Sequence, residues 1–180
     1  LRLMASAINA RELTQATSHE LFRLYNSLNL MHTGNSGMQK LLIIADRKGS
    51  GCATPRGLQL AHKLGIQADV VAFTYAPMKQ LKMKANQKAD VRKRLLAERE
   101  AVVQERIDRH KRDNQKVKLH VVWEKDIASW INKQCARGSY DGVLKTGQRT
   151  ETIAHASTDC QVLRECQARV LIIAEKKRHH

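Results

Sequence analysis

The chain reads Val143-Leu-Lys-Thr-Gly147 near its C-terminus, then Ser157-Thr-Asp-Cys-Gln-Val-Leu-Arg-Glu-Cys166, then Arg169-Val-Leu-Ile-Ile-Ala174. The first stretch predicts a buried strand that ends in a glycine-containing loop. The second predicts a capped helix. The third predicts another buried strand, because its apolar run is short and rich in β-branched residues. A strand, a helix and a strand in this order form the repeating unit of an α/β fold.

The same alternation of buried strands and amphipathic helices begins at Met38. Strands are predicted at Leu41–Ala45, Val70–Tyr75, Val117–Trp123, around Val143-Leu144, and at Arg169–Ala174. Helices are predicted from Thr54-Pro55 to Gly65, from Asp90 to about His110, from Asp126 to Gly138, and from Thr158 to Cys166. This order predicts an α/β fold with a five-stranded parallel sheet, Rossmann-like and doubly wound, with right-handed crossovers and helices on both faces.

Ligands on such sheets bind beyond the carboxyl ends of the strands. At that edge the sequence places Asp46 with the loop Gly49-Ser-Gly51, and also Lys145-Thr-Gly147. The Gly49-Ser-Gly51 loop lacks the GxGxxG spacing and the Lys of a P-loop. It therefore favours a turn, with anion binding at the following helix N-terminus as the alternative. Lys145 either meets a phosphate or reaches water.

The composition fits one globular domain with a core of its own. The chain has 180 residues, of which 42% are hydrophobic and 27% are charged. The longest apolar runs have five or six residues, far fewer than the ~20 that a membrane-spanning helix needs. No stretch near the N-terminus has the residue order of a signal peptide. We expect a cytoplasmic protein without membrane insertion.

The formal net charge is +15, and the stretch Lys79–Lys118 carries fourteen Lys and Arg against six Asp and Glu. Such an excess raises affinity for polyanions by counterion release. However, the whole chain has only two Trp, three Tyr and two Phe, so the aromatic groups that stack on single-stranded nucleic acid are scarce. We expect weak, non-specific polyanion binding.

Within this stretch, the predicted helix from Asp90 to His110 has an apolar stripe that we expect to face the sheet. The stripe consists of Val91, Leu95, Val102, Val103 and Ile107. Facing this stripe to the sheet would turn Arg92, Arg99 and Arg106 outward, where nearby glutamates neutralise part of their charge. The sequence therefore favours a solvated helix face.

The sequence gives little support for catalysis or metal binding. Four cysteines lack CxxC spacing and fit reduced core or boundary thiols; they are Cys52, Cys135, Cys160 and Cys166. The histidines include no HExxH motif. His155, Ser157 and Asp159 lie close in sequence, but triad members normally come from different elements and no GxSxG motif is present. We expect a protein that is not an enzyme.

Residues before Met38 do not follow the strand–helix pattern. Residues 1–37 read as a helical arm that ends in the linker His32-Thr-Gly-Asn-Ser-Gly37. About thirty residues cannot build a core, so we expect an accessory arm or the end of an upstream region. The folded domain is predicted at 38–177, followed by a tail at 178–180.

From Met38 to about Lys177 this order of elements, with an Asp ending the first strand, resembles the universal stress protein family. Val121-Val-Trp123, Leu144-Lys-Thr-Gly147 and the stretch Thr158–Cys166 resemble the E branch in particular, since the last is similar to that branch's Thr-Asp-x-x-Leu-Leu-Arg-x-Cys. The branch carries two such domains in tandem, and this chain carries one. The resemblance implies strand order 3-2-1-4-5 and pairing of two copies through the fifth strand, Arg169–Ala174.

Nucleotide-binding members of that family carry G-x2-G-x9-G-[ST] after the fourth strand, where backbone N–H groups cradle the phosphates. In this chain Gly147 is followed three residues later by Thr150, the segment is about three residues shorter, and Ala156-Ser157 replaces Gly-Ser. The resemblance implies a candidate nucleotide or anion site, made up of Asp46, Lys145, Thr146, Gly147, Ser157 and Thr158. Asp46 is either an adenine-side ligand or a helix cap, and Ser157 or Thr158 also fits a cap. No cofactor is expected, with weak ATP binding as the alternative.

Two classes of function follow. The first is a non-enzymatic stress-response domain that acts by dimerisation through Arg169–Ala174 and by protein contacts, with a residual nucleotide or anion site as an option. The second is binding of nucleic acid or an acidic partner through Lys79–Lys118. The first rests on the resemblance and the second on charge alone.

Overall fold

A computed structural model describes residues 38–46, 51–78, 84–147, 162, 165, 166 and 168–174. The predicted arm at 1–37, the tail at 178–180 and most of the predicted helix Thr158–Cys166 lie outside the described residues. None of the helices in the described ranges is long and apolar enough to cross a membrane.

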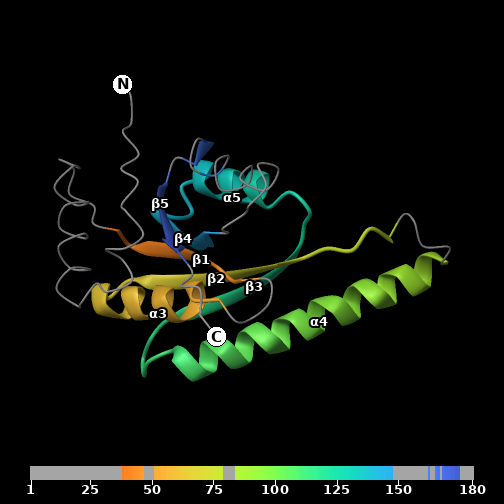
Figure 1. Ribbon diagram of the computed structural model, residues 1–180, viewed down its shortest axis with the longest axis horizontal. Coiled ribbons are helices and arrows are strands. Elements are labelled where there is room, and N and C mark those ends of the chain that lie inside the picture. Colours follow the sequence, from red (N-terminus) through yellow and green to blue (C-terminus); the bar gives the residue numbers. More distant parts are fainter. Residues whose placement is uncertain are drawn as a thin grey trace, which may run out of the picture.

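Five strands form one parallel sheet in the order β3-β2-β1-β4-β5 (Figure 1). They are β1 (Lys40–Ile44), β2 (Gln67–Thr74), β3 (Val117–Trp123), β4 (Gly142–Gly147) and β5 (Arg169–Ala174). In the middle of the sheet, Ile43 of β1 lies between Val70 of β2 and Leu144 of β4. The predicted fold class and strand order are confirmed.

Helices cover both faces of the sheet. Helices α3 (Ala53–Leu64) and α4 (Ala85–His110) lie on one face, and α5 (Ile127–Ala136) lies on the other (Figure 1). Successive side chains of a strand point to opposite faces. Leu41 and Ile43 therefore pack under α3 and α4, whereas Leu42 packs under α5. All three are fully buried, which explains the unbroken apolar run in β1.

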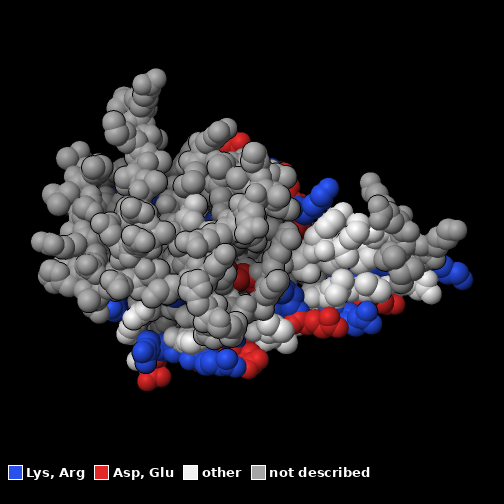
Figure 2. Space-filling view, viewed as in Figure 1, with Lys and Arg blue, Asp and Glu red and all other residues white. Residues whose placement is uncertain are grey.

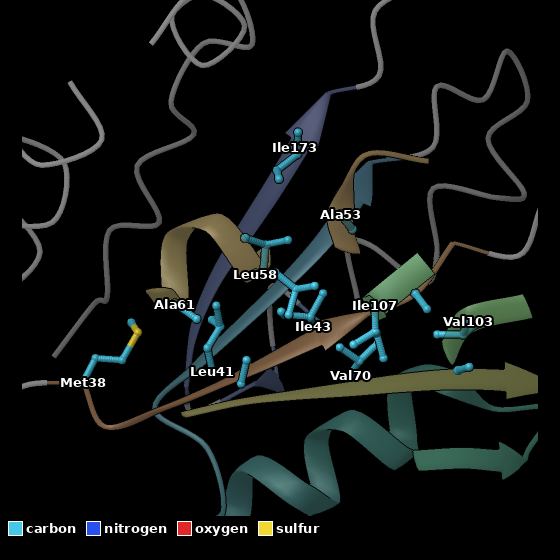
Figure 3. Packing of buried hydrophobic residues seen from close by; sticks show 14 residues of the cluster. Met38, Leu41, Ile43, Ala53, Leu58, Ala61, Val70, Val103, Ile107 and Ile173 are labelled. Carbon is cyan, nitrogen blue, oxygen red and sulfur yellow. The ribbon is translucent and has the colours of Figure 1, made fainter. Parts of the chain in front are cut away.

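Figure 3 shows how the core under α3 and α4 is filled. Leu58 of α3 and Ile107 of α4 point toward Ile43 and Val70 of the sheet. Close packing extends to the backbone, because a Cβ on Gly57 of α3 would lie 2.7 Å from Ile43 Cδ1. Helix α3 thus packs directly against β1, and this packing positions the start of the helix relative to the carboxyl end of that strand.

Some of the predicted helix boundaries hold and others move. Asp126 caps α5 by accepting a hydrogen bond from Ser129 N at 3.0 Å, as predicted. Gly65 ends α3 in the left-handed conformation, with φ 64°, also as predicted. The helix predicted to start at Thr54-Pro55 begins at Ala53 after Cys52, so Thr54 lies inside α3, where it is buried.

Helix α4 is longer than predicted and less amphipathic. It begins at Ala85 instead of Asp90 and has 26 residues. Its N-terminal half extends past the sheet (Figure 1), and only Val103 and Ile107 among its residues are buried. The prediction that Val102 faces the sheet is wrong: Val102 is 50% exposed, because neighbouring residues on a helix point about 100° apart.

Candidate functional site

At the carboxyl end of β1, Asp46 lies across the start of α3. Its Oδ2 accepts a hydrogen bond from Ala53 N at 3.3 Å. A Cβ on Gly51 would lie only 1.9 Å from Asp46 Cγ, so glycine at this position makes room for the carboxylate. A carboxylate at a helix N-terminus satisfies a free N–H and interacts favourably with the helix dipole. This is the geometry of a helix cap.

Two arginines of α4 reach the same junction. Arg99 Nη2 donates to the carbonyl oxygens of Asp46 at 2.6 Å and Ala45 at 3.4 Å, and Arg106 Nη2 donates to the carbonyl oxygen of Gly51. The prediction that Arg99 and Arg106 turn outward is wrong. They lie four residues before and three residues after buried Val103, which places all three on one helix face. The pair ties α4 to the β1–α3 junction and brings two positive charges to the ligand edge of the sheet.

The polar residues of β4 are buried within the sheet. The strand continues through Gly147, so Lys145 and Thr146 are strand residues and are 7% and 8% exposed. Lys145 Nζ donates to the carbonyl oxygen of Thr146 at 3.2 Å. Thr146 Oγ1 lies 3.9 Å from Cys52 Sγ, which joins β4 to the start of α3. Lys145 does not extend into water, because the alternation of side chains along β4 places it on the α5 side of the sheet.

Gly147 is the one glycine of the phosphate-binding pattern that the sequence retains. A Cβ at this position would lie 2.7 Å from Ile172 Cγ2 of β5, so the missing side chain leaves room for an isoleucine. A phosphate cradle needs that space open to the ligand. Ile172 therefore fills the space beside Gly147. Ser157 and Thr158 lie outside the described residues.

A second polar cluster was not anticipated from the sequence. Asp69 of β2 is buried on the α5 side of the sheet. Its Oδ2 lies 2.9 Å from Lys40 Nζ, 3.0 Å from the donating hydroxyl of Tyr140 and 3.4 Å from His120 Nε2. Gln67 Nε2 donates to Oδ1 at 2.9 Å. An aspartate inside an apolar strand is the signal that was available, because a buried carboxylate requires partners.

The Asp69 cluster lies toward the amino ends of the strands, away from Asp46 and Gly147. Burial raises the pKa of the Asp69 carboxyl, but hydrogen bonds from Lys40, Gln67 and Tyr140 outweigh burial and hold that pKa below its usual value. Burial first, and then the charge of Asp69, raise the pKa of Tyr140. The Lys40 ammonium also lies 4.7 Å from the centre of the Tyr140 ring. Each polar group has a partner, so the cluster fastens β1, β2, β3 and the segment before β4.

A third feature lies at the carboxyl ends of β2 and β3. Tyr75 and Trp123 have ring centres 5.9 Å apart, and the Arg92 guanidinium lies 5.4 Å from the centre of the Trp123 ring. Tyr75 is 47% exposed. In the described ranges, no group of three or more His, Cys, Asp or Glu could hold a metal ion. The aromatic pair with its arginine thus places an exposed ring and a cation at the carboxyl ends of these two strands.

No protein-family model matches the sequence, and no curated protein matches it significantly. Solved structures do match. The structure entitled "hypothetical protein MJ0577" aligns with a TM-score of 0.59 at 16% identity, over 78% of this chain and 98% of that one. The universal stress protein UspA from Lactobacillus plantarum aligns with a TM-score of 0.56 at 11% identity, over 77% and 99%. A universal stress protein in complex with cAMP gives 0.54 at 16% identity, over 77% and 98%.

This chain has the universal stress protein fold. The alignments cover nearly the whole of each neighbour, and the sheet order is the one that the family resemblance implies. The resemblance to universal stress proteins is confirmed at the level of the fold. The likeness to the E branch stays a prediction.

Proposed function

We propose that this chain is a non-enzymatic universal stress protein domain that acts in the stress response by pairing with a second copy and by binding protein partners. The edge strand β5 carries the proposal. Among the described residues, β5 is hydrogen-bonded to β4 alone, and its Val170, Leu171 and Ile172 are only half-buried. An apolar strand at a sheet edge is an association hazard unless something covers it. The same strand of a second copy is a self-complementary cover.

Light scattering coupled to size exclusion tests the pairing. We expect a dimer for the wild type and monomers or insoluble protein for Ile172→Lys, because a lysine cannot be buried unpaired against a partner strand. Val102→Lys places the same charge at an exposed site on α4 and should stay dimeric. Since Ile172 also contacts Gly147, circular dichroism must confirm that any soluble variant is folded. A wild type that is a clean monomer at micromolar concentration would overturn the proposal.

We further propose that the domain does not bind ATP strongly. Ile172 occupies the space beside Gly147, and Asp46 is engaged with Ala53 N at the start of α3. One structural neighbour is a complex with cAMP, so the fold itself can hold a nucleotide. Calorimetry with Mg-ATP and with cAMP should detect no binding of micromolar strength. Micromolar binding that Asp46→Ala abolishes would show that the ligand edge works as a nucleotide site after all.

The second candidate is binding of nucleic acid or an acidic partner through the basic stretch Lys79–Lys118. The Tyr75, Trp123 and Arg92 group favours it, because the exposed Tyr75 ring, next to half-buried Trp123 and the Arg92 cation, can stack on a base. Three ion pairs along α4 weigh against it: Arg94 with Glu98, Arg109 with Glu105, and Lys111 with Asp108. Figure 2 shows basic residues (blue) mixed with acidic residues (red) along the lower margin of the molecule, where α4 lies.

A salt titration separates the two candidates. We expect weak binding of single-stranded DNA that disappears near physiological salt, because binding by charge alone is lost as counterions are added. Tyr75→Ala should then change little. Affinity that survives at about 0.2 M salt and falls on Tyr75→Ala or Arg92→Glu would make nucleic-acid binding the primary function.

A further inference from the structure

Two cysteines that are 31 positions apart in the sequence meet on the α5 face of the sheet. Cys135, in the last turn of α5, is 4% exposed and belongs to the core on this face. Cys166 precedes β5, is half-buried and packs against the same core. Asn132, one turn before Cys135 on α5, donates to Glu165 Oε2 at 2.8 Å and so holds the residue before Cys166 against this helix. The two thiols lie close enough to affect each other's pKa, and the backbone of Ala168 interacts with both sulfurs. Both cysteines are free thiols.

We propose that Cys135 and Cys166 form a peroxide-reactive thiol pair, in which Cys166 reacts first and Cys135 resolves the product as a disulfide. The difference in burial assigns the roles. A small hydroperoxide can reach half-buried Cys166, whereas Cys135 is enclosed by the core. Redox-active cysteines are solvent-accessible and placed beside a resolving cysteine, and this pair meets both conditions.

The surroundings of the two sulfurs agree with these roles. The hydrogen bond from Cys135 lowers the pKa of Cys166 to about 7, and burial opposes this only in part. A large share of Cys166 is therefore thiolate at neutral pH, which is the form that attacks peroxides. The same hydrogen bond, together with burial, raises the pKa of Cys135 and keeps it protonated. The accessible sulfur is thus the nucleophile and the buried sulfur holds the proton.

The chemistry balances with a hydroperoxide as the oxidant. The Cys166 thiolate attacks the terminal oxygen of the hydroperoxide: an S–O bond forms, the O–O bond breaks, and the alcohol leaves after taking up a proton from water. The sulfur is oxidised to a sulfenic acid and the peroxide is reduced. The Cys135 sulfur then attacks Cys166: an S–S bond forms, the S–O bond breaks, and the hydroxyl leaves as water with the Cys135 proton. The bond would join α5 to the residues that lead into the edge strand β5.

The test uses the full chain with Cys52→Ser and Cys160→Ser, which leaves only the proposed pair. After treatment with hydrogen peroxide, mass spectrometry should find a Cys135–Cys166 cross-linked peptide that a reductant removes. Adding Cys135→Ser should leave Cys166 as a sulfenic acid that dimedone captures, whereas Cys166→Ser should leave Cys135 unmodified. Iodoacetamide should label Cys166 with a pH midpoint near 7.

Circular dichroism before oxidation shows whether each variant is folded, and Cys135→Ala replaces Cys135→Ser if the serine variant is not. The disulfide mapping needs neither variant, so it decides the matter alone if both unfold. Folded protein that yields no cross-linked peptide, or in which dimedone captures Cys135 as readily as Cys166, would overturn the proposal.

Discussion

At the scale of single residues, the ligand edge depends on how closely Gly51 and Asp46 approach each other. The carboxylate of Asp46 fills the place that a side chain at residue 51 would occupy, and from there it accepts the bond from Ala53 N. Arg99 donates to the carbonyl oxygen of Asp46, and Arg106 donates to that of Gly51. The junction is therefore set by these few contacts and not by a cap within α3 itself.

Gly51→Ala should destabilise the protein by about 1–3 kcal/mol, because the new methyl group displaces the Asp46 carboxylate. Asp46→Ala should cost about 1 kcal/mol through loss of the cap. The double variant should cost less than the sum of the two, since no carboxylate remains to be displaced. Urea denaturation of the four proteins measures this cycle. Additive costs would mean that the two residues are not coupled.

The Asp69 cluster makes stability depend on pH. The folded-state pKa of Asp69 lies below its unfolded value, so its contribution is fully present above the unfolded pKa of about 3.9. This contribution is lost as pH falls through the lower, folded-state pKa. Asp69→Asn should lower the free energy of unfolding at pH 7 by a few kcal/mol, about what breaking a buried ion pair costs.

The gap between Asp69→Asn and the wild type should narrow as the pH falls below about 4, since the wild-type carboxyl then protonates. Urea denaturation at pH 7 and at acid pH measures it. Asp113→Asn, at an exposed position, is the control and should change stability by less than about 0.5 kcal/mol at either pH. A gap that stays constant with pH would contradict the role of the Asp69 charge.

At the scale of elements, α4 is anchored by its C-terminal half. Val103 and Ile107 enter the core, whereas the N-terminal half runs past the sheet (Figure 1) and carries exposed charged residues such as Lys93 and Arg94. Only part of the apolar stripe predicted from the sequence therefore packs against the core. Arg99 and Arg106 extend the anchored face, and Arg92 lies over Trp123 nearer the free end.

Ile107→Ala should cost about 2–5 kcal/mol, because it removes a side chain that is 2% exposed and leaves a cavity under α4. Val102→Ala is the matched control on the same helix and should change stability by less than about 0.5 kcal/mol, since Val102 is 50% exposed. Thermal and urea unfolding measure both. Equal effects would mean that α4 is rotated about its axis and does not direct Ile107 into the core.

At the scale of the whole molecule, the described sheet is open and has two edge strands. β3 and β5 are its two edges, and they differ in character. β3 alternates half-buried and exposed residues and carries Lys118 and His120, which blunt an edge. β5 begins with Arg169, and the three residues that follow, Val170, Leu171 and Ile172, are all apolar. The proposed pairing through β5 and not β3 follows from this contrast.

A dimer gains stability from association, so its melting temperature rises with protein concentration. We expect such a rise for the wild type when its concentration increases from micromolar to hundreds of micromolar. A folded Ile172→Lys variant should melt at a temperature that does not change with concentration. Differential scanning calorimetry over this range measures both proteins. A wild-type melting temperature independent of concentration would contradict association through β5.

The sequence alone determined the order of the elements, the class of the sheet and the burial of β1, because hydrophobic periodicity and helix-ending glycines act over a few residues. It also located Asp46 and Gly147 at the carboxyl ends of β1 and β4. The inference of strand order needed the family resemblance, which the fold confirms.

The tertiary structure alone decided which distant side chains meet. Asp69 and Tyr140 are 71 positions apart, and Arg99 and Asp46 are 53 apart. Whether they touch depends on which strands are neighbours and on how a helix is rotated, and no local pattern encodes either. The same holds for Cys135 and Cys166, whose spacing matches no motif. Packing turned Arg99 and Arg106 inward and brought these two thiols together, because each helix has one face that must cover the sheet.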